Sequence, residues 1–183
     1  MNTILPSGLE AKFQRFDSDL TLDDDFAIAG YASLFGARDQ GGDLVEKGAY
    51  AKSLGAGRKV KMLWQHDPSE PIGIWDEIRE DDRGLFVRGR LLKSVARARE
   101  AAALTRAGAI DGLSIGYRTV KSHKDEKGAR CLSEVELWEV SLVTFPMLPD
   151  ARLAPHEAKS DVLHELAKVF EDARLNLAAR KAR

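Results

Sequence analysis

A serine and a histidine in this 183-residue chain have the surroundings that nucleophilic catalysis needs. A serine hydroxyl becomes a nucleophile when a base lies within hydrogen-bonding reach and nearby donors stabilise the oxyanion that forms. Ser114 lies in DGLSIGY, between Gly112 and Gly116, and glycines let a substrate backbone approach closely. A serine between small residues is equally an ordinary strand residue, so spacing alone leaves both interpretations open.

His66 is the candidate base, because it ends an apolar strand. In VKMLWQHD, Met62, Trp64 and His66 share one face, since side chains alternate along a strand with a period of two. Pro68 is predicted to end this strand, because proline lacks the amide that a ladder requires. A histidine that merely terminates a strand is the alternative. The other histidines fall in a charged turn or in the C-terminal tail: His123, His156 and His164.

A carboxylate partner for the imidazole is expected on the strand that contains LWEVSLV. Strand alternation puts Glu136 and Trp138 on one face and Leu137, Glu139 and Ser141 on the other. Glu139 therefore lies on a mainly apolar face, where an unpaired charge is costly, and a histidine ring nitrogen is a reasonable partner. Glu136 has the plainer interpretation of a solvated charge.

The sequence predicts no metal site and no cofactor. Cys131 and the histidines show no pair at the spacing of metal ligands, and no His-Glu-x-x-His run occurs. The string DQGGD is interpreted as a turn, and no glycine-rich phosphate-binding signature is present.

The elements that must position these residues are mostly strands. Alternating or apolar runs, bounded by glycine, proline and aspartate, predict strands, and runs rich in Ala, Arg, Glu and Leu predict helices. The expected strands cover 26–35, 60–66, 71–78, 84–92, 113–120 and 131–145, and the expected helices cover 46–54 and 95–107. The segments 71–78 and 84–92 are predicted to form a hairpin through REDDRG.

Three regions are expected along the chain. Residues 1–25 are interpreted as an N-terminal arm, or as a first edge strand over Ala11–Phe16, ahead of a domain over 26–152. Residues 153–183 form a tail with one apolar stripe between Val162 and Leu177, which predicts an amphipathic helix. This helix is expected either to pack on its own domain or to serve in docking, dimerisation or trimming.

Composition restricts the class of protein. An apolar share of 44% and a charged share of 31% describe a globular chain, and a net charge of −1 gives no footprint for nucleic acid. No apolar run approaches the roughly 20 residues that span a bilayer. With one cysteine, no intramolecular disulfide forms, and the acidic start is unlike a secretory signal. A cytosolic protein that binds neither nucleic acid nor membrane is expected.

Five segments, read in order, resemble the tailed-phage prohead maturation proteases. They lie between residues 26 and 152: FAIAGYASLFG, GAYAKSL, VKMLWQHD, GAIDGLSIGY and LWEVSLVTFPMLPDA. The resemblance implies the fold of the herpesvirus assembly proteases, an α+β but mainly β chain. Its core is a mixed, mostly antiparallel β-barrel with helices packed around it.

The resemblance also implies a function. Members are serine endopeptidases, packaged inside an immature phage capsid in the cytoplasm of the bacterial host. They cleave scaffold, or the scaffold-like arm of the major capsid protein, and commonly cleave themselves. Relatives in fold are dimers, so a homodimer is expected by analogy.

Carried onto this chain, the resemblance implies roles for the residues above. His66 is the general base, Ser114 the nucleophile and Glu139 the carboxylate that orients the imidazole, with Glu136 in reserve. Related herpesvirus enzymes use a second histidine in the third place, so the choice of the third member stays open. Oxyanion donors are expected among backbone amides, with Ile115 and Gly116 as candidates. Two alternatives stay open: a non-catalytic assembly or scaffold factor that keeps the fold, and an esterase-type acyl hydrolase.

Overall fold

Most of the chain that the computed structural model describes, residues 3–4, 10–14, 21–22, 26–39 and 41–144, is β-strand. The strands are β1 (Thr3–Ile4), β2 (Glu10–Gln14), β3 (Thr21–Leu22), β4 (Ala27–Leu34), β5 (Leu44–Val45), β6 (Lys61–Trp64), β7 (Asp67–Glu80), β8 (Gly84–Leu91), β9 (Gly112–Lys124) and β10 (Arg130–Val143). The helices of the described part are α1 (Ala51–Gly55) and α2 (Ala96–Arg106).

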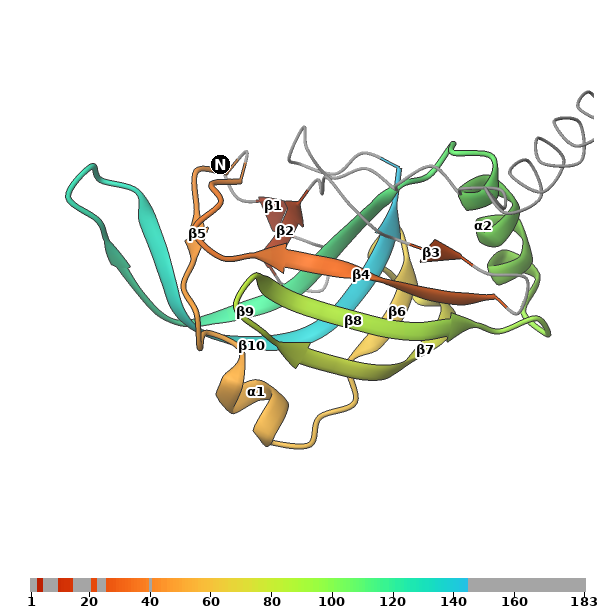
Figure 1. Cartoon of the computed structure of the whole chain (residues 1–183), viewed down its shortest axis with the longest axis horizontal. Coiled ribbons are helices and arrows are strands. Elements are labelled where there is room, and N and C mark those ends of the chain that lie inside the picture. Colours follow the sequence, from red (N-terminus) through yellow and green to blue (C-terminus); the bar gives the residue numbers. More distant parts are fainter. Residues whose placement is uncertain (1–2, 5–9, 15–20, 23–25, 40, 145–183) are drawn as a thin grey trace, which may run out of the picture.

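The strands form one curled, mixed sheet. Its order is β1-β2-β9-β10-β6-β7-β8-β4-β3, and β5 pairs with β10 outside this path. Strand β10 runs parallel to β5 and β6, and the remaining pairs are antiparallel. The sheet curls into a half-barrel, so that β4 also contacts β9 (Figure 1). The predicted fold class, α+β but mainly β with a mixed, mostly antiparallel barrel and helices around it, is confirmed, and the barrel is a half-barrel with few helices in the described residues.

The curled sheet encloses the core. Large side chains from widely separated strands are fully buried there, and burying one such side chain contributes roughly 1.5–3 kcal/mol. They include Ile28, Met62, Ile72, Leu85, Ile115, Tyr117, Leu137 and Leu142. Since β6, β9 and β10 contribute many of them, the strands that carry the candidate site residues are also fixed by the core.

The helices follow the sequence prediction to different extents. Helix α2 agrees with the helix expected over 95–107 and buries Ala98, Ala101 and Ala102 on one side, at helical spacing. Helix α1 is shorter than the segment 46–54, because Gly48 has a φ of +91° and ends any helical run there.

The hairpin predicted through REDDRG is confirmed, and Asp81 organises its turn. The carboxylate of Asp81 accepts hydrogen bonds from the Arg83 and Gly84 amides and from the side chains of Tyr31 and Arg79, at distances of 2.7–3.1 Å. Burial acts to raise the pKa of Asp81, but these hydrogen bonds outweigh it and lower the pKa to about 2. The ionised carboxylate therefore stabilises the fold.

Asp81→Ala is expected to lower the free energy of unfolding by about 2 kcal/mol at neutral pH. Because the pKa of Asp81 is lower in the folded than in the unfolded chain, its contribution is complete above about pH 4 and disappears as the pH falls to about 2. Urea unfolding of the variant and the wild type should therefore differ at pH 7 and converge near pH 2. Asp82→Ala, at an almost fully exposed neighbour, is the matched control and should change little.

Two predicted boundaries are wrong, and both concern histidines. Strand β6 ends at Trp64, and β7 begins at Asp67 rather than being excluded by Pro68. Pro68 is tolerated because the register shifts between Trp64↔Asp67 and Leu63↔Pro71, so it occupies an irregular stretch where no ladder bond requires its amide. His66 thus lies in a turn and does not continue a strand face.

The second correction concerns the hairpin of β9 and β10. Its strands extend to Lys124 and Arg130, so His123, expected in a turn, is a strand residue paired with Cys131. Asp125 closes the shorter turn by accepting hydrogen bonds from the amides of Lys127 and Ala129.

The structure describes the strand predicted near the N-terminus but not the helix predicted in the C-terminal tail. Strand β2 overlaps the edge strand expected over Ala11–Phe16 and pairs with β9. The helix predicted within 153–183 lies outside the described residues. The boundaries at 25/26 and 152/153 stay predictions.

Candidate active site

Ser114, His66 and Glu139 form one buried chain of hydrogen bonds. The Nε2 atom of His66 lies 2.6 Å from Ser114 Oγ, and its Nδ1 atom lies 2.6 Å from Glu139 Oε1. All three side chains are buried. The structure therefore brings together the three residues to which the sequence analysis gave the roles of nucleophile, base and orienting carboxylate.

The three residues come together because they lie on, or directly after, neighbouring strands of the sheet. Ser114 lies near the start of β9, directly opposite Ser141 on β10, and Glu139 lies opposite Gly116 in the same ladder. On the other side of β10, the parallel strand β6 ends at Trp64, paired with Leu142. The turn after β6 therefore lies at the same end of the sheet as Ser114, and His66 in that turn can contact both strands' side chains.

The turn that carries His66 has an unusual backbone. Gln65 and His66 are the two residues between β6 and β7, and their φ angles are +52° and +62°, in the left-handed region that glycine favours. Such a conformation costs of the order of 1–3 kcal/mol per residue and persists where the surroundings fix it. Here the Gln65 amide donates to the Leu142 carbonyl at 2.9 Å, and the Gln65 and Thr144 side chains are 2.5 Å apart.

The Glu139 carboxylate uses both oxygens. Oε1 faces His66, and Oε2 accepts a hydrogen bond of 2.9 Å from the hydroxyl of Ser141. Since burying a charge is costly without partners, Ser141 helps to hold the carboxylate in place. Sequence reasoning assigned no role to Ser141. The signal available was its position two residues after Glu139, on the same face of the strand.

Gly116 makes room for Glu139. A Cβ atom at this position would lie 2.4 Å from Glu139 Oε1 and 2.5 Å from its Cγ. These separations are well below van der Waals contact, so the carboxylate can only occupy its place because residue 116 lacks a side chain. The glycine was expected to admit a substrate backbone; in the structure it makes room for the carboxylate, and the substrate role stays a prediction.

Gly116→Ala is expected to slow the reaction of Ser114 at least about 10²-fold. The new methyl group would displace the Glu139 carboxylate, and a misplacement of about 1 Å can lower a reaction rate by this factor. The rate at which a fluorophosphonate labels Ser114 measures the effect. In a Glu139→Gln background, Gly116→Ala should lower the labelling rate little further, because the negative charge that the alanine would displace is already absent. An unchanged labelling rate in Gly116→Ala, with the fold intact, would contradict this role.

Glu136, the reserve candidate, lies on the opposite face of β10. Its carboxylate forms ion pairs with Arg58 and Arg118, and Arg58 also stacks over the ring of the exposed Trp138. The structure therefore does not bring Glu136 to His66, and the alternation of side chains along the strand explains the difference from Glu139.

The predicted oxyanion donors lie inside the sheet. Ile115 and Gly116 each have a register partner on β2 and another on β10. An amide that is hydrogen-bonded in a ladder has no second hydrogen to donate, so oxyanion binding by these amides would require the ladder to open at Ile115 and Gly116. Their role as oxyanion donors stays a prediction.

The geometry suits one kind of chemistry. When Glu139 accepts the Nδ1–H of His66, the Nε2 lone pair faces the Ser114 hydroxyl and can take its proton. A curled, mainly β sheet that holds a buried serine, histidine and glutamate in this order has the arrangement of a serine hydrolase.

The particular family follows from sequence comparison. Residues 14–165 match the family described as caudovirus prohead serine protease, and the chain belongs to that family. The chain is also 35% identical over 129 residues to the prohead protease of Enterobacteria phage HK97, across 68% of this chain and 57% of that protein. It therefore spans little more than half the length of this relative. The resemblance seen in the sequence is confirmed.

One solved structure supports the fold. The bacteriophage T4 capsid assembly protease superposes with a TM-score of 0.62 at 16% identity, over 75% of this chain and 98% of that chain. The varicella-zoster virus protease gives a TM-score of 0.42 at 16% identity, over 67% and 59% of the two chains. At such identities the first similarity shows the fold alone.

In the described part of the chain, neither helix has the length and apolar character needed to cross a lipid bilayer.

Proposed function

We propose that this chain is a serine endopeptidase of phage capsid maturation. One observation carries the proposal: a member of the prohead protease family holds the hydrogen-bond chain from Ser114 through His66 to Glu139, with both bonds at 2.6 Å. Its substrate is the scaffold, or the scaffold-like arm of the major capsid protein, and it also cuts itself. Cleavage takes place inside the prohead, in the host cytoplasm.

The mechanism follows from the two hydrogen bonds of His66. As Ser114 Oγ attacks the scissile carbonyl carbon, its proton passes to Nε2 of His66. The imidazolium then donates that proton to the departing amine, and the acyl group stays on Ser114. Water attacks the acyl-enzyme by the same route, with His66 first accepting and then returning a proton. The peptide is released as a carboxylic acid and Ser114 is restored.

Glu139 assists through charge and orientation. Its carboxylate fixes which nitrogen of His66 carries hydrogen, and it stabilises the positive ring that forms in each half-reaction. Ser141 keeps this carboxylate in place from the side away from His66. Ser114 itself has no exposed surface in the structure, so part of what covers it must move before a substrate reaches it.

Labelling with a fluorophosphonate tests the activated serine. Phosphonylation of Ser114 Oγ releases fluoride, and peptide mapping by mass spectrometry should find the adduct on Ser114 alone. Ser122, exposed on the same strand β9, is the internal control and should remain unmodified. No adduct on the folded protein, or equal adducts on both serines, would contradict the proposed nucleophile.

The choice of substrate separates the proposed protease from an esterase. Both would label with the fluorophosphonate, but only a protease would cut the capsid protein. Turnover of small activated esters, together with an intact capsid protein after long incubation, would favour the esterase.

Sedimentation of the purified chain tests the homodimer expected from relatives in fold.

A further inference from the structure

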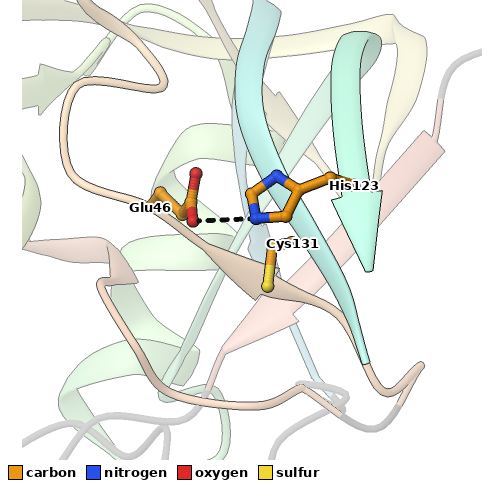
Figure 2. A group of neighbouring side chains, drawn as sticks. All are labelled: Glu46, His123 and Cys131. Atoms are coloured by element: carbon orange, nitrogen blue, oxygen red, sulfur yellow. Dashed lines mark ion pairs between the residues drawn. The ribbon is translucent and has the colours of Figure 1, made fainter. Parts of the chain in front are cut away.

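A second group of reactive side chains lies far from the proposed active site. Glu46, His123 and Cys131 lie together at the distal part of β9 and β10, next to β5 (Figure 2). Their ligand atoms all lie within 4.8 Å of one another. Cys131 is eight residues from Glu139 along β10, which corresponds to roughly 25 Å of extended strand.

The register of three strands creates this group. His123 on β9 is directly opposite Cys131 on β10, and directly opposed residues share a face of the sheet. Leu44 on β5 pairs with Cys131 from the other side, and Glu46 follows Leu44 by two residues, on the same face. The Glu46 amide donates to the Leu132 carbonyl at 3.0 Å, so the pairing extends to this residue.

The distances suit a bridging ion better than direct bonds. His123 Nε2 lies 3.4 Å from Glu46 Oε1, longer than a good hydrogen bond. Cys131 Sγ has only a weak contact with the Ala129 carbonyl, at 3.9 Å. Around a tetrahedral zinc ion, neighbouring ligand atoms are separated by roughly 3.3–3.6 Å. Because the three ligand atoms all lie within 4.8 Å of one another, a movement of about 1 Å brings them to this range, and the partly exposed Glu46 and His123 side chains permit it by rotation.

We propose that Glu46, His123 and Cys131 bind a zinc-type divalent cation. A thiolate, an imidazole and a carboxylate suit the borderline-soft ions Zn²⁺ and Co²⁺, whereas Ca²⁺ and Mg²⁺ require oxygen ligands. Three protein ligands leave a fourth tetrahedral position for water. A Glu46–His123 ion pair alone explains two of these residues, but it gives no reason for a thiol in the same place. The ion would join β5 to the hairpin of β9 and β10.

Cobalt substitution tests the site through its thiolate. The chain has one cysteine, so a thiolate-to-cobalt charge-transfer band can only come from Cys131. Reduced, tag-free protein titrated with Co²⁺ should develop this band together with tetrahedral d–d absorption, and added Zn²⁺ should remove both. Cys131→Ser should abolish the charge-transfer band. His123→Gln and Glu46→Gln should each weaken Co²⁺ binding at least about 10-fold.

Glu126→Gln is the matched control, because Glu126 is an exposed acid in the nearby turn and not a member of the group. It should leave Co²⁺ binding unchanged. The site is refuted if no charge-transfer band develops, or if the band survives undiminished in both His123→Gln and Glu46→Gln. Circular dichroism of each variant establishes that it is folded. The test is independent of the proposed protease, since it requires no turnover.

Discussion

Ser114→Ala is expected to abolish cleavage of the capsid protein and leave the fold unchanged. Removal of a triad serine costs roughly 10⁴–10⁶-fold in turnover, because the acyl-enzyme can no longer form. Alanine is smaller than serine by one oxygen atom and is apolar, so it fits the fully buried position of Ser114 on β9, between β2 and β10. The variant should therefore unfold at nearly the same denaturant concentration as the wild type.

Co-expression with the major capsid protein that is proposed as the substrate measures the result. Mass spectrometry of the capsid protein's termini should find cut chains with the wild type and full-length chains with Ser114→Ala. Ser122→Ala changes an exposed serine on the same strand and should cut as the wild type does. Identical uncut products from wild type and Ser114→Ala would instead favour a non-catalytic assembly factor that keeps the fold.

Much of this fold could be predicted from local patterns. Alternation along 131–145 put Glu139 on the buried face and Glu136 on the other, and the structure agrees for both residues. The hairpin of β7 and β8 and helix α2 were also predicted, because their turn residues and alanine-rich composition act within a few residues of one another. In these elements, local propensity and tertiary packing favour the same secondary structure.

The rest depends on contacts that a linear pattern does not contain. Two-residue turns with positive φ at both positions are typically marked by Asn-Gly, Asp-Gly or Gly-Gly, and Gln65-His66 is none of these pairs, so nothing in the sequence marked a turn there. The place of Glu139 over Gly116 depends on the register between β9 and β10, which is set by the whole ladder. The same register brings His123 to Cys131, although their spacing along the chain suggested no metal ligands.

Glu139→Gln is expected to lower turnover roughly 10³–10⁴-fold with little change in KM. The magnitude follows from triads in which the corresponding carboxylate was replaced by its amide. Glutamine has nearly the same shape, and Ser141 Oγ can accept a hydrogen bond from the new amide nitrogen. The packing around His66 is therefore kept, while the charge that stabilises the imidazolium is lost. Steady-state cleavage of a capsid-derived peptide separates the effect on turnover from that on KM.

Glu136→Gln is the matched control, since it makes the same chemical change three residues away on the other face of β10. It removes ion pairs with Arg58 and Arg118 at partly exposed positions, which should cost less than about 1 kcal/mol of stability and leave turnover within a few-fold of wild type. If Glu139 were only a structural residue, Glu139→Gln would lower the free energy of unfolding and leave the turnover of the folded fraction unchanged. A larger loss of turnover in Glu136→Gln than in Glu139→Gln would instead transfer the orienting role to the reserve residue. The pair of variants therefore decides whether the hydrogen bond at His66 Nδ1 serves catalysis or only the fold.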